Sequence, residues 1–190
     1  AALEEEVDHI AALVESIRDF LTSPSGVPTL IDVETELRAV SRRSPYPFTV
    51  RSSDESHRIV IDRLRFQSII SNLITNAHQA MHEGRSDAPS GARGEETPVV
   101  SVTTDGTSSR PMVRIDVSDA GPGFTVSDRH VVFDPFFTTR DHGSGIGLSA
   151  VYAFTHAAGG TVTIGDRAGG GATVSITLPS ANDTEHNQEA

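Results

Sequence analysis

The stretch from Val113 to Ala153 constrains this chain most, because it joins a strand, two glycine-rich segments and a helix in a fixed order. Apolar and polar residues alternate over 113–118, the period-two pattern of a half-buried strand. Asp119 continues the inward-facing series, and a buried ionised carboxylate is costly unless it is hydrogen-bonded. Gly121-Pro122-Gly123 then breaks the strand. The pattern predicts a carboxylate held at a strand end for contact with a ligand.

A mixed loop follows and carries Phe133, Phe136 and Phe137, whose rings are expected to anchor part of it because they are too apolar to move freely in water. The loop closes on Gly143-Ser144-Gly145-Ile146-Gly147, where a helix opens. Glycines let a ligand approach the backbone, and the free N–H groups of a helix start favour phosphate. Asp119 can accept a hydrogen bond from an exocyclic amino group such as that of adenine. Any one feature alone would be an ordinary turn or helix start, but together they predict a nucleotide site.

Two familiar phosphate loops are excluded. A Walker loop needs a lysine next to its last glycine, and no lysine stands near these glycines. A dinucleotide fingerprint needs its glycines directly after a strand, whereas a long loop comes first here. The site therefore belongs to a different class.

A second constellation lies on the helix predicted for about 63–82. Its apolar residues fall on one broad face: Phe66, Ile69, Ile70, Leu73, Ile74, Ala77 and Met81. Asn72 and Asn76 are one turn apart at the border of that face, although asparagine is a poor helix former. A carboxamide oxygen suits Mg²⁺, which keeps waters and substrate phosphates in its other positions. Two solvated surface residues are the alternative, and beside the glycine loops we favour a metal site with Asn76 as the direct ligand.

Composition limits the class of protein. With 190 residues the chain supports one good core, and a net charge of −11 argues against nucleic acid and anionic membranes as partners. The absence of cysteine excludes disulfides and thiolate metal sites. No apolar run approaches membrane-spanning length.

The rest of the chain reads as short strands, one further helix and polar connections. Residues 1–21 carry an apolar seam at alternating spacings of four and three, typical of a coiled coil or helical bundle. The predicted elements after it are strands at 29–33, 48–52 and 57–61, a helix at 34–43, and hairpins joining 99–103 to 112–118 and 161–165 to 172–178.

Five motifs in order carry a resemblance to a known family. They are Asn72-Leu-Ile-Thr-Asn76-Ala, Asp119-Ala-Gly-Pro-Gly123, Phe133-Asp-Pro-Phe-Phe-Thr-Thr-Arg140, Gly143-Ser-Gly-Ile-Gly147-Leu and Gly169-Gly-Gly-Ala-Thr. The set closely resembles the ATP-binding catalytic domain of bacterial sensor histidine kinases. The run from Asn76 to Met81 and the segment from Phe136 to Arg140 look most like the nitrogen-regulation-type subgroup.

The resemblance implies a fold and a division of the chain. The fold class is α+β, a two-layer sandwich of the Bergerat type in which helices cover one face of a mixed sheet. Residues 29–179 form the ATP-binding domain, with an ATP lid at about 124–144. Residues 1–22 are similar to the second helix of a dimerisation hairpin, 23–28 are a linker and 180–190 a disordered tail.

The resemblance also implies the site residues and the cofactors, ATP and Mg²⁺. Asn72, Asn76 and Arg140 are the catalytic residues, with Asn76 as the metal ligand. The residues implied to bind the cofactor are Asn76, Gln79, Asp119, Gly121, Gly123, Phe136, Thr138, Thr139, Gly143, Ser144, Gly145, Ile146, Gly147, Leu148 and Thr173. The chain departs from the pattern at Gln79, where many members have a basic residue, and at Ala172, where a hydroxyl usually helps to hold adenine.

The function implied is γ-phosphoryl transfer to a histidine on a helix that we expect outside this chain. Its partners would be that histidine-bearing dimerisation helix, a response-regulator receiver domain and a second copy of the parent protein, in the cytoplasm, with no nucleic acid. His9 is followed by Ile10 and not by an acid, so it is not expected to be the acceptor.

Two alternatives stay open. A hydrolytic ATPase of the same fold would carry a water-activating glutamate where Asn72 stands, and an amide cannot act as a general base. A degenerate nucleotide-binding scaffold is the other alternative; the intact glycines, Asn76 and Asp119 argue against it, whereas Ala172 favours it.

Overall fold

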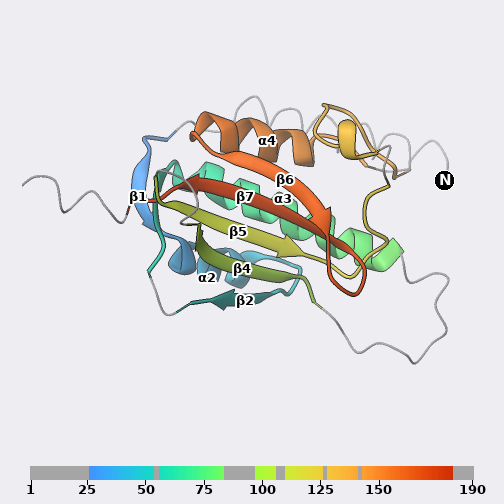
Figure 1. Cartoon of the computed structure of the whole chain (residues 1–190), viewed down its shortest axis with the longest axis horizontal. Helices are drawn as coiled ribbons and strands as arrows, with labels where there is room; N and C mark the ends of the chain where they lie inside the picture. Colours follow the sequence, from blue (N-terminus) through green and yellow to red (C-terminus); the bar gives the residue numbers. More distant parts are fainter. Residues whose placement is uncertain are drawn as a thin grey trace, which may run out of the picture.

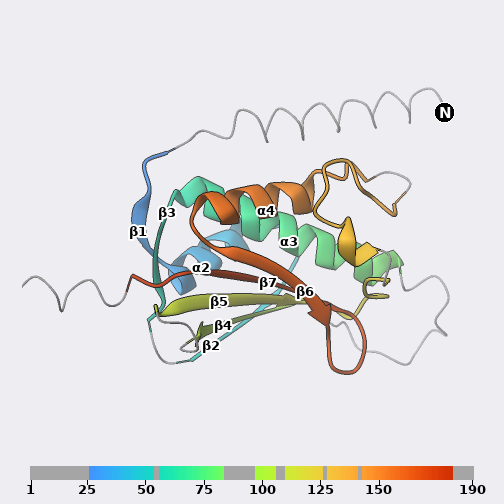
Figure 2. The same cartoon turned by 45° about the horizontal axis from the view of Figure 1, so that its top comes forward.

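The apolar face of one long helix organises the part of the chain that the structure describes. In the computed structural model these residues are 26–53, 56–83, 97–105, 110–125, 128–140 and 143–181. Helix α3 (Arg63–Glu83) lies across a five-stranded sheet, with α4 (Gly147–Ala157) beside it on the same face (Figures 1 and 2). Its buried residues are the predicted ones, and each is at most 4% exposed: Phe66, Ile69, Ile70, Leu73, Ile74 and Ala77. Only Met81, in the last turn, is merely half-buried.

The sheet is mixed, as the resemblance implies. Its order is β2 (Thr49–Ser52), β4 (Val99–Asp105), β5 (Met112–Ser118), β7 (Ala172–Pro179) and β6 (Thr161–Asp166). Strand β2 runs parallel to β4, and all other neighbours are antiparallel. Both predicted hairpins, β4–β5 and β6–β7, are confirmed, and so is the α+β fold class.

Two of the predicted strands form a separate small sheet. The sequence predicts these strands but not their pairing with each other. Strand β1 (Thr29–Asp32) pairs antiparallel with β3 (Arg58–Ile61), while β2, between them in the chain, joins the large sheet. Ile59 and Ile61 of β3 are buried, whereas Val60 is 54% exposed, so β3 has one face toward the core. Neighbouring strands in the chain are thus separated because each has a different surface to cover.

The helices begin in different ways. Asp32 caps α2 (Val33–Arg43), accepting a hydrogen bond from the Thr35 N–H at 2.8 Å. Asp62 does the same for α3, accepting from the Leu64 N–H at 2.8 Å. Helix α4 follows Ile146, which has no capping side-chain hydrogen bond. The start of α4 is therefore the one of these three that keeps its backbone N–H groups for a ligand.

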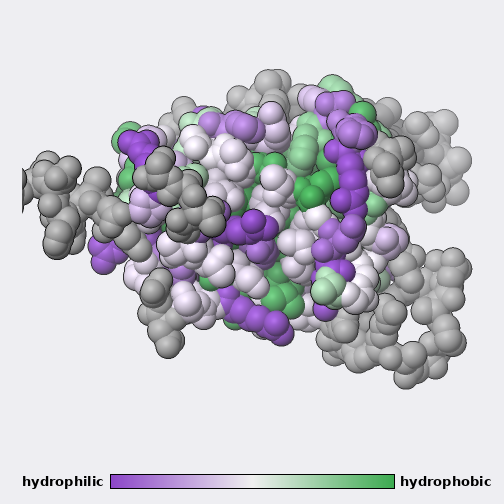
Figure 3. Space-filling model, viewed as in Figure 1, coloured by the Kyte–Doolittle hydropathy of each residue, from purple (hydrophilic) through white to green (hydrophobic). Residues whose placement is uncertain are grey.

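The sheet face turned away from the helices carries polar side chains, and the space-filling view shows a hydrophilic patch near its middle among pale and some hydrophobic areas (Figure 3). Arg114 forms an ion pair with Asp116 at 2.8 Å and donates to the Ser175 hydroxyl at 2.9 Å. Ser118 and Thr173 share a hydrogen bond of 2.8 Å between their hydroxyl oxygens. Along β5 these residues alternate with buried ones, as expected for a sheet covered on one side, whereas Ser175 of β7 is itself only 4% exposed.

Some predicted segments lie outside the described residues. These include the predicted dimerisation helix at 1–22, the first half of the linker and nearly all of the tail. The division of the chain into those parts stays a prediction. Within the described ranges, no helix has both the length and the apolar content needed to cross a membrane.

Gly171 is expected to be much less tolerant of alanine than Gly170, its neighbour in the same turn. Both have positive φ, +104° and +99°, which costs a non-glycine residue about 1–3 kcal/mol. A Cβ at Gly171 would also overlap the Asp119 carbonyl oxygen, whereas nothing lies within 4 Å of one at Gly170. Urea unfolding should therefore show a larger loss of unfolding free energy for Gly171→Ala than for Gly170→Ala. Equal losses of unfolding free energy would contradict the close approach of the Gly171 backbone to that of Asp119.

Candidate functional site

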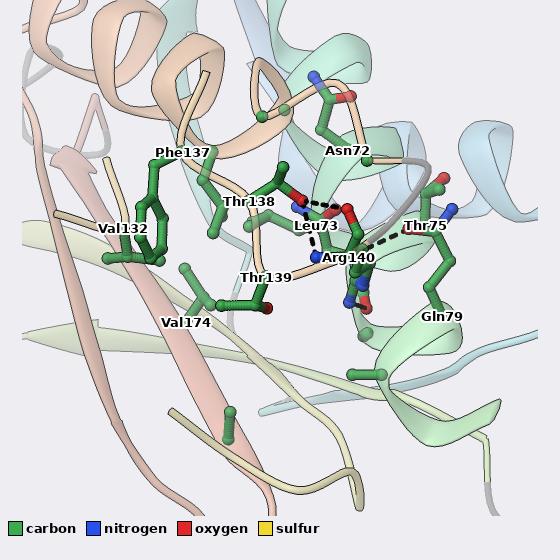
Figure 4. A pocket seen from close by; sticks show the side chains of 18 of the residues that line it. Asn72, Leu73, Thr75, Gln79, Val132, Phe137, Thr138, Thr139, Arg140 and Val174 are labelled. Carbon is green, nitrogen blue, oxygen red and sulfur yellow. Dashed lines mark hydrogen bonds between the residues drawn. The ribbon is translucent and has the colours of Figure 1, made fainter. Parts of the chain in front are cut away.

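A cavity of about 460 Å³ lies between α3, the start of α4, the ends of β5 and β7, and the loop that precedes α4 (Figure 4). One part of its wall is apolar: Leu73, Ala77, Val117, Phe124, Val132, Phe137, Ile146, Leu148, Ala150, Phe154, Ala172 and Val174. The polar side chains of the wall are Ser68, Asn72, Thr75, Asn76, Gln79, Asp119, Thr138, Thr139, Arg140 and Ser144. A concave site that combines apolar side chains with polar groups from several elements is suited to a small molecule.

Asp119 is the buried carboxylate of this cavity. It is 6% exposed, and its Oδ1 accepts hydrogen bonds from the N–H of Gly121 at 2.8 Å and of Ala172 at 3.3 Å. Burial raises the pKa of Asp119 above its ordinary value, although these two hydrogen bonds oppose the rise. Because both bonds end on Oδ1, a ligand can use Oδ2 as its acceptor. At the end of β5 this carboxylate can therefore accept a hydrogen bond from a ligand.

The two asparagines of α3 face the start of α4. A Cβ added to Gly147 would lie 3.4 Å from Asn76 Nδ2 and 3.8 Å from Asn72 Oδ1. Both side chains are half-buried at the border of the apolar face, as predicted. Which amide atom is oxygen follows from the hydrogen-bond network and not from shape. Neutral amide oxygens next to uncapped helix N–H groups fit a hard cation that is shared with phosphate.

Arg140 brings a positive charge to the same part of the cavity. Its Nη1 donates to Gln79 Oε1 at 2.8 Å, and its Nη2 donates to the Asn76 carbonyl oxygen at 3.1 Å (Figure 4). Its own N–H donates to the Thr138 hydroxyl at 3.0 Å. The guanidinium group of Arg140 therefore joins the lid to α3. Gln79 helps to hold the Arg140 side chain in this position.

The glycine-rich segment before α4 lies close to the lid backbone. Gly145 has a φ of +66°, and a Cβ there would overlap the backbone of Phe136. The Phe136 N–H also donates to the Gly145 carbonyl oxygen at 3.0 Å. Only glycine fits at 145, which explains one glycine of the predicted motif.

Most of the predicted site residues line the cavity. They are Asn72, Asn76, Gln79, Asp119, Gly123, Thr138, Thr139, Arg140, Gly143, Ser144, Gly145, Ile146, Gly147 and Leu148. The structure thus brings residues from α3, the end of β5, the lid and α4 into one site. Their roles toward a ligand stay predictions.

Three predicted site residues are absent from the cavity wall as described. Gly121 packs against Ala80, where a Cβ would come within 2.9 Å of its backbone. Thr173 points to the other sheet face, because side chains alternate along β7 and Ala172 and Val174 take the cavity side. Phe136 has a φ of 69° and is 63% exposed.

Phe136 also corrects the expectation that all three rings anchor the lid. Phe133 packs against the core and lies 5.5 Å from Tyr152 between ring centroids, and Phe137 lines the cavity. The positive φ of Phe136 turns its side chain outward instead. Two rings anchor the lid, and the third is on the surface.

Sequence reasoning missed the apolar wall of the cavity. Phe124, Val132 and Phe154 belong to this wall, although no sequence motif singles them out. The family resemblance concerns only the hydroxyl that Ala172 lacks, yet the alternation along β7 places this residue in the cavity wall beside Asp119. That alternation was the signal that could have found it.

Residues 61–182 match the family described as histidine kinase-, DNA gyrase B- and HSP90-like ATPase. The sensor protein FixL of Bradyrhizobium diazoefficiens is 34% identical over 125 residues, which are 66% of this chain and 22% of FixL. The sensor histidine kinase ZraS of Escherichia coli O157:H7 is 32% identical over 186 residues, 93% of this chain and 37% of ZraS. The chain thus spans well under half the length of these relatives.

Solved structures share the fold of this chain. Full-length ShkA in complex with AMPPNP has a TM-score of 0.66 and 26% identity, covering 94% of this chain and 37% of that one. The catalytic domain of histidine kinase ThkA has a TM-score of 0.61 and covers 81% of this chain and 96% of that one. At 23% identity the second likeness concerns the fold alone.

The matched region includes every residue of the cavity wall: those of α3 with both asparagines, Asp119, those of the lid and of the start of α4, and those of β7. The predicted relation to the ATP-binding catalytic domains of sensor histidine kinases is confirmed, and the nitrogen-regulation subgroup stays a prediction. By sequence, fold and the position of its cavity, the chain belongs to the histidine kinase-, DNA gyrase B- and HSP90-like ATPase family.

Proposed function

We propose that this domain binds Mg²⁺ and ATP and positions the γ-phosphate for transfer to a histidine of a two-component sensor kinase. The observation that carries the proposal is the division of the cavity. Asp119 lies at the ends of β5 and β7, while Asn76, Arg140 and the start of α4 lie together elsewhere in the same cavity. A nucleotide has this same division, with an apolar base that carries an amino group and a charged phosphate chain.

The base would lie against Ala172 and Val174 with its amino group at Asp119. A buried carboxylate accepts from an amino group and repels a carbonyl, so adenine is favoured over guanine. Asp119 is held in place by backbone N–H groups, which keeps Oδ2 directed at the ligand without a further side chain. Ala172 contributes packing and no hydroxyl.

The phosphates would meet the start of α4, Ser144 and Arg140. The chain contains no lysine, so its cation in this part of the cavity is arginine. Asn76 and Asn72 are the residues that would hold Mg²⁺, whose bound charge would neutralise the phosphate oxygens and orient the chain. Arg140 can exchange its bonds to Gln79 and Asn76 for bonds to phosphate.

Hydrolysis is disfavoured by the residue one turn before Asn76. An ATPase that activates water needs a general base there, and Asn72 supplies a neutral amide. The proposed acceptor is therefore a histidine presented by another segment, as the name sensor histidine kinase ZraS suggests for that protein. A dimerising helical hairpin and a response-regulator receiver domain are the proposed protein partners, and the cytoplasm is the proposed compartment.

Replacing Asp119 should remove adenine recognition. Asp119→Asn is expected to weaken ATP binding about tenfold or more, since a charged hydrogen bond contributes roughly 1.5–3 kcal/mol. Asp116→Asn is the matched control, because Asp116 lies on the opposite face of the same sheet and pairs with Arg114. GTP should compete poorly with ATP for the unchanged domain. Equal affinities for ATP and GTP in calorimetry would refute this role.

ATP affinity should fall on acidification at a higher pH than the ordinary aspartate pKa of 3.8 predicts, because burial raises the pKa of Asp119 and only the ionised form accepts the hydrogen bond. The pH dependence of the unfolding free energy has the opposite sign. The contribution of Asp119 to stability is present below pH 3.8 and is lost as pH rises through the raised pKa. Calorimetric titrations at several pH values test this. In the Asp119→Asn domain ATP affinity should not fall in this pH range. If its affinity depended on pH in the same way as that of the unchanged domain, Asp119 would not be the titrating group.

Residues 1–190 alone are expected to bind Mg-ATP without labelling themselves. None of the described histidines lines the cavity, and transfer needs an imidazole positioned at the γ-phosphate. Incubation with γ-labelled ATP should give little acid-labile label and little released phosphate. Adding the histidine-bearing hairpin should produce base-stable phosphohistidine, and Asn76→Ala should abolish it. Strong labelling of the chain alone that disappears in His9→Gln or His82→Gln would show that the acceptor is here.

A further inference from the structure

Two histidines meet one turn apart on α3, away from the nucleotide cavity. The Nε2 atoms of His78 and His82 are 2.7 Å apart, and their ring centroids are 4.2 Å apart with an interplanar angle of 82°. Neither residue lines the cavity, although Asn76, Gln79 and Ala80 of the same helix do. The two rings, called the histidine pair below, therefore converge on one point outside that cavity.

Tyr46 holds one member of the pair. Its ring stacks on His78 with centroids 4.2 Å apart and an interplanar angle of 27°. Tyr46 itself packs against the core, and its backbone is fixed by two hydrogen bonds with the Ser44 hydroxyl, at 3.1 and 2.8 Å. The orientation of His78 is thus set before any ligand arrives, which lowers the entropy cost of binding at this point.

The chemistry of the pair selects a class of ligand. Two histidines four residues apart on one helix face are the spacing that directs two imidazoles at one metal ion. Imidazole nitrogen suits Zn²⁺, Cu²⁺ and Ni²⁺, whereas Mg²⁺ and Ca²⁺ prefer oxygen ligands. We propose that His78 and His82 form a two-ligand site for a divalent transition-metal ion, separate from the nucleotide site, with water in the remaining positions.

The geometry needs only a small adjustment. Tetrahedral zinc with Zn–N bonds of about 2.0–2.1 Å places two nitrogens roughly 3.3 Å apart, so the pair must open slightly from its hydrogen-bonded distance of 2.7 Å. In the hydrogen-bonded pair one Nε2 carries a hydrogen; that ring must move it to Nδ1 so that both Nε2 lone pairs face the metal. No net proton is released by this step.

The site is an open one. Among the residues that the structure describes, no group of three or more histidine, aspartate, glutamate or cysteine side chains could hold a metal together. Affinity should therefore be weaker than that of closed four-ligand zinc sites, and it should follow the order Cu²⁺ above Zn²⁺ and Ni²⁺.

The test is calorimetric titration of the metal-free chain with zinc chloride, without nucleotide. His82→Ala and His82→Gln should each weaken binding about tenfold or more, because one of two ligands is lost. His156→Ala is the matched control. His156 also contacts a tyrosine ring, that of Tyr152, with centroids 4.2 Å apart and an interplanar angle of 52°, and no histidine lies one turn from it. It should bind zinc like the unchanged chain.

A second measurement identifies the ligands directly. Electron paramagnetic resonance of added Cu²⁺ should show two coordinated nitrogens in the unchanged chain and one in His82→Gln or His78→Gln. Circular dichroism in the presence of a chelator checks that each variant is folded. Equal zinc affinity and stoichiometry in the unchanged chain and His82→Ala would overturn the proposal, as would a loss caused by His82→Ala but not by His78→Gln.

Discussion

The packing of α3 against the sheet is the interaction on which the rest of the structure depends. One face of this helix supplies six nearly inaccessible side chains to the core. Because the helix is held so firmly, the residues at the border of that face have little freedom, and two of them are Asn72 and Asn76. The same packing presents Gln79 to the lid, where it meets Arg140. The core thus determines where the polar groups of the cavity lie.

Asp119 shows how the sheet accepts an unfavourable group at its edge. A carboxylate that is 6% exposed would be strongly destabilising alone, and two backbone N–H groups offset part of that cost. Those N–H groups are available because β7 begins beside the end of β5 and Gly171 lets the two backbones approach. The remaining cost is retained as a raised pKa, which is a usual sign of a functional group.

Much of this could be predicted from the sequence because it rests on periodicity and local chemistry. The alternation in β5, the apolar face of α3 and the glycine-rich start of α4 each follow from short stretches. The pairing of β1 with β3 could not be predicted, since it depends on which buried surface each strand covers. The outward turn of Phe136 follows from a backbone angle that its side chain does not favour, and no pattern in the sequence announces it. Thr173 was predicted in the site from the family resemblance, whereas the alternation along β7 directs its side chain to the opposite face of the sheet.

The polar side chains on the helix-free sheet face have a consequence for what can bind there. The Arg114–Asp116 ion pair and the Ser118–Thr173 hydrogen bond satisfy one another within the sheet. Water therefore wets this face without strain, and another protein gains little by displacing it. The two faces of the sheet therefore differ in what they can bind. On the polar face the side chains already bond to one another, whereas the other face carries the cavity, with polar groups in its wall.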